Sequence, residues 1–335
     1  MPSVAAERGE GEADESRLTL VREHDGRGSG EMTGRAAQTG GGREDMVELA
    51  GGSFRMGSER FYPEERPVRL VEVRRFWIDP QPVTVQQFQR FVEATGYVTL
   101  AARVPAAEDY PDADPDLLVP GSLVFNKTAG PVSLNDVRAW WSYVPGARWD
   151  RPEGPGSTTD ERADHPVTQI AYEDAQAYAS WAGKALPTEA EWEFAARGGL
   201  EGATFTWGEE LMPEGRPAGN WWQGEFPWQN LMLDGWERTS PIGAFPANGY
   251  GLYDMCGNVW EWTSSAWSSE QNNRSPCCAG GTDHTAHRQR RVVKGGSHLC
   301  APNYCLRFRP AARQGEEIDT STSHIGFRCV VREDT

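Results

Sequence analysis

The chain has 335 residues, enough for one large domain or two ordinary ones, and 38% of them are hydrophobic. Its formal net charge of −16 argues against binding to nucleic acid, which needs clustered Lys and Arg. No apolar run is long enough for a membrane span, and the acidic N-terminus lacks the apolar core of an export signal, so a cytoplasmic protein is expected. Fourteen tryptophans, 37 glycines and 23 prolines favour a compact, loop-rich fold.

The ordered part of the chain is expected to begin near residue 45. Residues 1–44 mix charges with glycine and predict a disordered tail, and residues 45–335 are expected to form a single domain. From Met46 onward the pattern predicts a short strand, a glycine turn and a second strand, with a further strand over residues 68–73.

Three amphipathic helices are expected, each with its own start or stop signals. The first lies between Thr84 and Gly96 and the third between Thr188 and Gly198, and both threonines open a capping box. The second runs through the segment YEDAQAYASWA and stops at Gly183. No helix is predicted after Gly198, which indicates short strands and long ordered loops in the rest of the chain.

Cys300 and Cys305 lie five positions apart, just after a glycine pair. Two thiols at this spacing can close a small disulfide, ligate one soft metal ion, act as nucleophile and resolving partner, or simply be buried together. Structural zinc usually needs four ligands, and no second Cys-x2-Cys or His pair accompanies these two, whereas two thiolates suit Cu(I). Arg307, Arg309 and Arg313 would favour thiolate over thiol if they lie close in space.

The other cysteines and the polar-loop histidines are not expected to carry chemistry. Cys256 and Cys329 are expected to be small core residues. Cys277 and Cys278 are expected to be bystanders in a polar loop. His284 and His287 are expected to face solvent.

Two segments offer closely spaced oxygen ligands. The segment DMCGNVWEW carries Asp254 and Glu261 with glycine and carbonyl groups between them, and a second segment carries Asn220 and Asp234. Hard oxygen ligands on a loop suit Ca²⁺, which tolerates irregular coordination. The alternative is a turn whose polar groups satisfy each other.

Taken together, several motifs closely resemble the formylglycine-generating enzymes, also called sulfatase-modifying factors. They are LPTEAEWEFAARGGL, NWWQGEFP, NGYGLYDMCGNVWEW, KGGSHLCAPNYCLRFRPAAR and HIGFRC, and the resemblance runs from about Met46 to Val330. Lectin-like binding proteins and sulfoxide synthases share several of these motifs, and the cysteine pair is the discriminating element. The resemblance implies an α+β, C-type-lectin-like fold, low in regular secondary structure, with short strands and a few helices.

The resemblance also implies a copper-dependent aerobic oxidase. Such an enzyme converts a cysteine in a Cys-x-Pro-x-Arg segment of an unfolded or nascent sulfatase to Cα-formylglycine (3-oxoalanine), with O₂ and a thiol reductant as co-substrates. By this likeness Cys300 and Cys305 hold Cu(I), Ser297 lies beside the oxygen pocket, and Trp260 is an active-site tryptophan that excludes water. His298 replaces a common aromatic residue and is expected to be a spectator. A monomer without nucleic-acid or membrane partners is expected.

Two structural calcium ions are implied as well. One would be bound by Asn220, Asp234 and the carbonyls of Trp221 and Trp236, and the other by Asp254, Glu261 and the carbonyls of Met255, Gly257 and Val259. Asp254 stands where asparagine often occurs, which should keep or strengthen its site, and Trp221 replaces a common aliphatic residue.

Three other functions compete with the oxidase. A non-catalytic peptide- or carbohydrate-binding protein could use the same lectin-like fold. A sulfoxide synthase would need an iron site of three histidines, and histidine is scarce in this chain, with six in all. A cofactor-free thiol–disulfide oxidase could use the same cysteine pair without copper.

Overall fold

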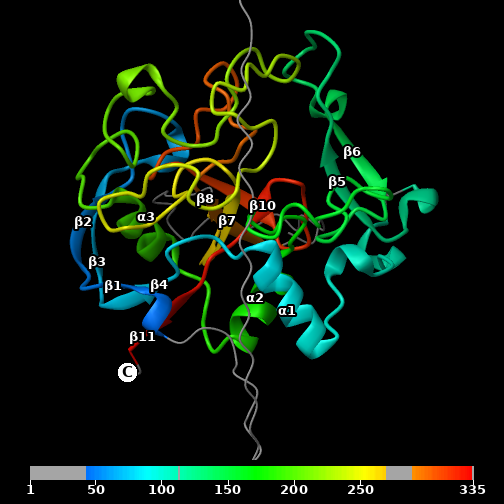
Figure 1. Cartoon of the computed structure of the whole chain (residues 1–335), viewed down its shortest axis with the longest axis horizontal. Helices are drawn as coiled ribbons and strands as arrows, with labels where there is room; N and C mark the ends of the chain where they lie inside the picture. The colour runs from blue at the N-terminus through cyan, green and yellow to red at the C-terminus, as the bar shows by residue number, and fades with distance from the viewer. Residues whose placement is uncertain (1–42, 112–113, 269–288, 334–335) are drawn as a thin grey trace, which may run out of the picture. The chain divides into compact units, whose positions relative to one another are not determined.

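The computed structural model describes residues 43–111, 114–268 and 289–333, all within one compact unit, Gln38–Thr335 (Figure 1). The helices are α1 (Val85–Thr95), α2 (Tyr172–Trp181) and α3 (Glu189–Arg197). The strands are β1 (Val47–Leu49), β2 (Gly52–Met56), β3 (Arg69–Val73), β4 (Phe76–Ile78), β5 (Gly121–Phe125), β6 (Trp141–Pro145), β7 (Trp260–Ala266), β8 (Arg290–Lys294), β9 (Arg313–Glu317), β10 (Ile325–Gly326) and β11 (Val330–Arg332). Short 3-10 turns lie in the connections, among them η1 (Arg43–Asp45) and η2 (Pro63–Glu65).

The strands form several small sheets instead of one large one. The largest among the described residues has the order β10-β7-β8-β9, in which β10 and β7 are parallel and the other neighbours antiparallel. In a second sheet β4 lies between β1 and β11, and two-stranded sheets join β2 to β3 and β5 to β6. The two strands expected after Met46 are present as β1 and β2, but they pair with different partners.

All three expected helices are confirmed. Thr84 and Thr188 each accept a hydrogen bond from the backbone N–H three residues later, and Gly96 and Gly198 close α1 and α3 in the left-handed conformation, at φ 67° and 56°. Helix α2 ends at Trp181, shortly before the expected stop at Gly183. No α-helix follows Gly198 in the part of the chain that is described.

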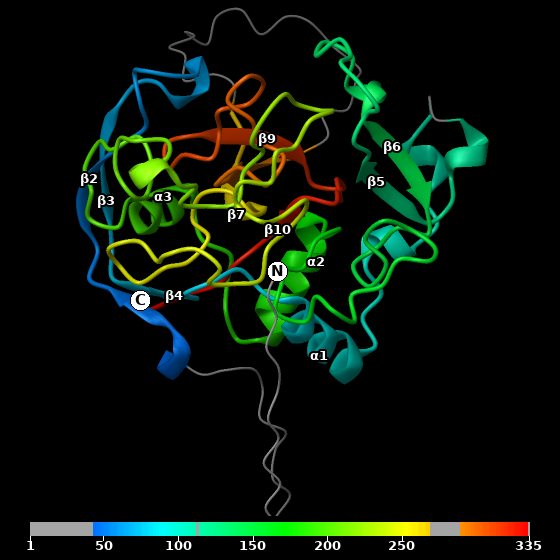
Figure 2. The ribbon, with the colours of Figure 1, turned by 45° about the horizontal axis from the view of Figure 1, so that its top comes forward.

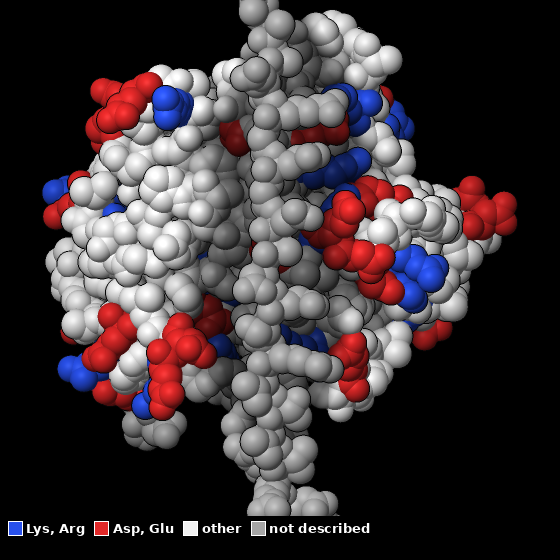
Figure 3. Space-filling model, viewed as in Figure 1, with Lys and Arg blue, Asp and Glu red and all other residues white. Residues whose placement is uncertain are grey.

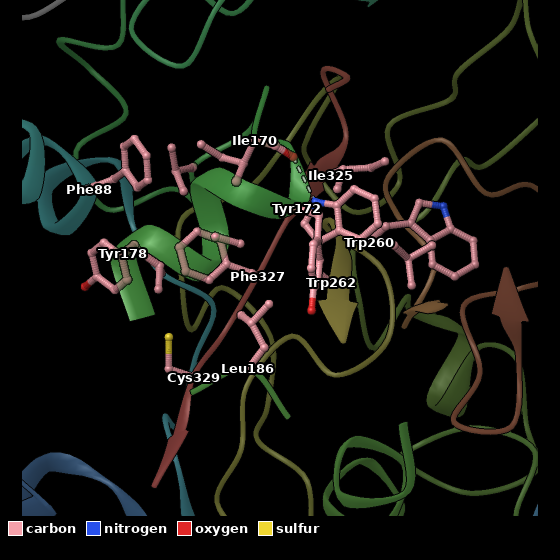
Figure 4. Packing of buried hydrophobic residues seen from close by; sticks show 14 of the residues in the cluster. Phe88, Ile170, Tyr172, Tyr178, Leu186, Trp260, Trp262, Ile325, Phe327 and Cys329 are labelled. Atoms are coloured by element: carbon pink, nitrogen blue, oxygen red, sulfur yellow. Dashed lines mark hydrogen bonds between the residues drawn. The ribbon is translucent and has the colours of Figure 1, made fainter. Parts of the chain in front are cut away.

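Aromatic side chains from distant elements form the main core (Figure 4). Phe88 of α1 stacks on Tyr178 of α2 with ring centroids 5.9 Å apart, and Tyr178 meets Phe327 edge-on at 5.3 Å. The indole N–H of Trp262 donates to the Ile170 carbonyl at 2.8 Å, which satisfies its polar group inside the core. Cys256 and Cys329 are buried free thiols, as expected.

Buried ion pairs tie the central sheet to its neighbours. Arg328, fully buried, donates to both carboxylate oxygens of Glu261 on β7, at 2.7 and 2.8 Å. Lys294, the last residue of β8, donates to Glu193 of α3 at 3.0 Å. Because a buried charge must be paired, the contact of Lys294 ties the end of β8 to α3, just before the cysteine loop begins.

Both ribbon views show the same arrangement of the helices and small sheets. Helices α1 and α2 lie side by side, and the β2–β3 and β5–β6 sheets lie on opposite sides of the central sheet (Figure 1, Figure 2). Where Figure 3 shows described residues, basic and acidic side chains are interspersed. No helix among the described residues is long and apolar enough to cross a membrane.

Candidate active site

The two cysteines of the loop after β8 lie close together in space. The Cys300 and Cys305 sulfurs lie 3.3 Å apart, and both thiols are free. Cys300 is only 2% exposed, whereas Cys305 is half-buried. A tight turn brings them together, because the N–H groups of Tyr304 and Cys305 both donate to the Ala301 carbonyl, at 2.9 and 2.6 Å.

Two glycines lead the chain from β8 into this loop. Gly295 and Gly296 have φ values of 94° and 70°, which side chains rarely tolerate. A Cβ atom on Gly296 would lie 2.7 Å from the Cα and N atoms of Phe308. The glycine pair therefore lets the segment before Cys300 pack directly on the backbone that follows Cys305.

The environment of the pair shifts the pKa values of the two thiols in opposite directions. A hydrogen bond from the Cys300 thiol, aided by the charge of Arg307, lowers the pKa of Cys305 to about 7 against the opposing effect of burial. Burial raises the pKa of Cys300 well above its ordinary value. The arrangement favours a thiolate at Cys305 over one at Cys300, with the neighbouring thiol as the stabilising donor.

Of the three nearby arginines, Arg307 is the one placed against the pair. Its Nη1 lies 3.8 Å from the Cys305 sulfur. Arg309 instead pairs with buried Glu65, and Arg313 donates to both oxygens of Glu189, at 2.7 and 2.9 Å. The basic character of this stretch is thus mostly structural.

Ser297 and Trp260 are both buried near the start of the cysteine loop. The Ser297 carbonyl accepts the Cys300 N–H at 2.9 Å, and its hydroxyl oxygen accepts the Leu299 N–H at 3.2 Å, which leaves the hydroxyl proton available. Trp260 opens β7 and belongs to the same buried cluster as Cys300. Both residues are thus part of the buried surroundings of the cysteine loop.

One ring nitrogen of His298 is already engaged by a backbone carbonyl. Its Nδ1 and its backbone N–H both contact the Asn258 carbonyl, at 2.9 and 3.0 Å. Burial lowers its pKa to about 4, so it is neutral at physiological pH. The role of His298, expected to be a spectator, stays a prediction, since these hydrogen bonds engage only one of its ring nitrogens.

The first expected calcium segment brings several oxygens together. The Trp221 carbonyl and the Asp234 carboxylate both accept from the amide of Gln223, the latter at 2.8 Å. The Asn220 side-chain oxygen is buried without a partner, and burial raises the pKa of Asp234. Trp236 contributes its N–H to Asp234 at 2.9 Å. A buried oxygen without a hydrogen-bond partner is the feature of this segment that fits a hard cation.

The second expected calcium segment holds one carboxylate with an unpartnered oxygen and one that is fully engaged. One oxygen of Asp254 is buried without a partner, and burial raises the pKa of this residue to about 6. Glu261, in contrast, already accepts hydrogen bonds from Arg328 and from the indole of Trp192, at 2.7 Å. The carbonyl-bearing residues between them, Met255, Gly257 and Val259, lie in one tight buried loop.

Backbone hydrogen bonds join these oxygen-rich segments to the cysteine loop. The Gly257 N–H donates to Gly295 at 2.9 Å, and the Trp222 N–H donates to the Cys300 carbonyl at 2.9 Å. The Asn258 N–H donates to the Asn220 carbonyl at 2.8 Å, which joins the two segments to each other. The loop that carries Cys300 is therefore held from both.

Comparison with known proteins identifies the family. Residues 32–333 match the model of the sulfatase-modifying factor enzyme 1-like domain. A formylglycine-generating enzyme from Mycobacterium tuberculosis is 54% identical over 85% of this chain and 97% of its own length. The chain belongs to the formylglycine-generating enzyme family. The Bos taurus formylglycine-generating enzyme is also similar, at 42% identity over 85% of this chain and 74% of that protein.

Members of the formylglycine-generating enzyme family share their fold with more distant proteins. The structure of PvdO from Pseudomonas aeruginosa superposes with a TM-score of 0.57 at 24% identity, covering 86% of this chain and 94% of PvdO. Treponema denticola variable protein 1 gives a TM-score of 0.50 at 16% identity, with the same coverage. The expected α+β fold, low in regular secondary structure, is confirmed.

Two residues near the cysteine pair were not predicted from the sequence, and four predicted residues cannot be compared with the structure. Tyr62 and Glu64 contact the segment just after Cys305, although they precede it by more than 240 positions. Their only sequence signal is an acidic, aromatic stretch, FYPEE, that could complement the downstream arginines. The expectations for Cys277, Cys278, His284 and His287 fall outside the described residues.

Proposed function

We propose that this protein is a copper-dependent formylglycine-generating enzyme. Its substrate would be an unfolded or nascent sulfatase polypeptide, whose cysteine in a Cys-x-Pro-x-Arg segment it oxidises to Cα-formylglycine. The observation that carries the proposal is the pair of free thiols, Cys300 and Cys305, 3.3 Å apart and half-shielded from water. We further propose that the protein acts in the bacterial cytoplasm as a monomer.

The donor set fits a soft, low-coordinate metal ion. Cys300 and Cys305 would hold Cu(I), because thiolates are soft ligands and two converging sulfurs leave room for a third, the thiol of the substrate. Bound Cu(I) would supply the one-electron chemistry with O₂ that thiols alone lack. A neutral pH suits binding, since Cys305 is half-ionised there and a metal releases the remaining protons.

The chain's own residues would confine and orient the reaction. The reaction balances as one substrate thiol, one O₂ and two reductant thiols giving one aldehyde, one H₂S, one disulfide and one water. Ser297 can donate its free hydroxyl proton toward a bound oxygen atom. Trp260, which is buried in the same core cluster as Cys300, would help to exclude water from the site.

Mass spectrometry of a Cys-x-Pro-x-Arg peptide tests the proposal. The peptide is incubated in air with the Cu(I)-loaded full chain and a thiol, and conversion of its cysteine to the aldehyde is measured. Cys300→Ala and Cys305→Ala should each abolish conversion and Cu(I) binding, and Cys256→Ala, which removes another buried free thiol, should leave both intact. Conversion that persists in either pair variant would refute the proposal.

A non-catalytic role on the same fold is the main alternative. A Bos taurus relative, 38% identical over 89% of this chain and 92% of its own length, is named inactive C-alpha-formylglycine-generating enzyme 2. Stoichiometric Cu(I) binding accompanied by O₂ uptake would exclude a simple peptide- or carbohydrate-binding protein. Activity that survives a Cu(I) chelator would instead indicate a cofactor-free thiol–disulfide oxidase.

We also propose that calcium occupies the two oxygen-rich segments. The buried, unpartnered oxygens of Asn220 and Asp254 support this, because each would otherwise lack a hydrogen bond or a counter-charge. Chelation of calcium should lower the thermal midpoint of the wild type, and Asp254→Ala should remove much of that dependence. A midpoint that does not respond to chelator or to added calcium would argue against both sites.

A further inference from the structure

A segment far upstream packs against the residues that follow Cys305. Residues 61–65, here named the Tyr62 segment, include the turn η2. The Tyr62 hydroxyl oxygen accepts the backbone N–H of Leu306 at 2.9 Å. The guanidinium of Arg307 lies over the Tyr62 ring, 3.9 Å from its centroid, and donates to Glu64 at 2.8 Å. The same arginine reaches the Cys305 sulfur.

The Tyr62 segment is itself firmly anchored. Glu65 is 2% exposed and accepts hydrogen bonds from both terminal nitrogens of Arg309. The guanidinium carbon of Arg309 lies 3.7 Å from the centroid of the Phe61 ring. The Glu65 carbonyl accepts the Ser58 N–H at 3.2 Å. A Cβ atom on Gly57 would lie 2.4 Å from that same carbonyl, so the backbone here is closely packed. A contact from this segment is therefore a contact from the body of the fold.

The two sulfurs of the pair differ in how they are held. Cys300 is buried, and its backbone is bonded on both sides, to Ser297 and to Trp222. Cys305 ends the turn closed by the Ala301 carbonyl and is partly exposed, and it is followed by residues outside any strand or helix. The Leu306 N–H, next in the chain, is satisfied by the Tyr62 side chain. The position of the second sulfur thus depends on the Tyr62 segment.

We propose that Tyr62 and Glu64 are positioning residues. They set the Cys305 sulfur at the distance from the Cys300 sulfur at which both can bind one soft metal ion. Tyr62 does so through the Leu306 backbone, and Glu64 does so by fixing Arg307 beside the sulfur. The inference rests on the proposed copper site, because positioning matters there for the metal. It predicts that changes far from the cysteines in sequence alter the affinity of the pair without unfolding the protein.

The test uses Tyr62→Phe, which removes one hydroxyl and keeps the ring. Loss of one hydrogen bond is expected to weaken Cu(I) binding about 3- to 10-fold, measured in the reduced full chain by competition with a chromophoric Cu(I) chelator. Glu64→Gln, which keeps a hydrogen-bond acceptor for Arg307, should weaken it less. Tyr143→Phe is the matched control, because it also loses one hydroxyl hydrogen bond, the one to Val119 at 2.6 Å.

A second readout separates this inference from the proposed function. Phenylarsine oxide binds two thiols at once and needs no copper, so its affinity reports the geometry of the pair alone. Tyr62→Phe should weaken arsenical binding by a factor similar to that for Cu(I), and Tyr143→Phe should not. If the wild type binds the arsenical but not Cu(I), the copper proposal fails, and the arsenical result still decides the role of Tyr62. Unchanged arsenical and Cu(I) affinities in both Tyr62→Phe and Glu64→Gln would overturn the inference.

Discussion

The ionisation of Cys305 can be read directly from its reactivity in the reduced, metal-free protein. Only the thiolate reacts with iodoacetamide, so the rate follows the thiolate fraction. With a pKa of about 7, half of Cys305 is thiolate at pH 7, whereas an ordinary thiol with a pKa of about 8.5 is only roughly 3% ionised. The rate should therefore fall about tenfold per pH unit below pH 7 and reach a plateau above about pH 8.

The structure also predicts how the midpoint moves when its causes are removed. The hydrogen bond from Cys300 is the largest cause of the lowered pKa, and the charge of Arg307 is the next stabilising one. Cys300→Ala leaves burial as the main remaining influence, so the midpoint should rise to at least the ordinary value of about 8.5. Arg307→Met should raise it by less.

Peptide mapping by mass spectrometry is the appropriate assay, because it follows Cys305 separately from the other cysteines. Buried Cys256, whose pKa burial raises to about 12, serves as the internal reference and should stay unmodified across the range. A wild-type midpoint near 8.5, or a midpoint that does not move in Cys300→Ala, would refute the reasoning that one thiol stabilises the other as thiolate.

Other predictions concern stability and can be checked by urea unfolding. Glu261→Gln leaves the buried Arg328 charge uncompensated and should cost about 3–5 kcal/mol, part of which Arg328→Met should recover in the double variant; a cost below about 1 kcal/mol would contradict the pairing. Gly257→Ala should cost about 2–4 kcal/mol, because φ is 88° and the new Cβ would lie 2.1 Å from the Asn220 carbonyl, whereas Gly156→Ala, at φ 93° in open space, should cost less. Thr188→Ala should cost about 1 kcal/mol through the lost helix cap, and Thr188→Ser should retain most of the stability.

The helices were predictable because their signals are local. The capping threonines and closing glycines of α1 and α3 lie within a dozen residues of one another, and the structure places each of them as the pattern indicates. The pairing of strands was not predictable in this way. Strands β1 and β2 are neighbours in sequence, yet β1 joins β4 and β2 joins β3, since pairing depends on how the whole core assembles.

The placement of the expected site residues follows their motifs, and their chemical roles stay predictions. Cys300, Cys305, Ser297 and Trp260 come from two contiguous motifs, and the structure buries or half-buries all four around one loop. Which arginine would face the pair could not be read from the sequence. The three basic side chains differ only in their long-range partners, Glu64, Glu65 and Glu189.

The contact between Tyr62 and Leu306 also has a consequence for the order in which the molecule is made. Its two partners are 244 positions apart, so during synthesis the tyrosine emerges long before the cysteine loop. The tyrosine therefore lacks this partner for most of the synthesis, and the contact forms only when the last quarter of the chain folds onto the first. Under the proposed positioning role, the full affinity of the two sulfurs for one metal ion is thus a property of the finished fold, completed in its last step.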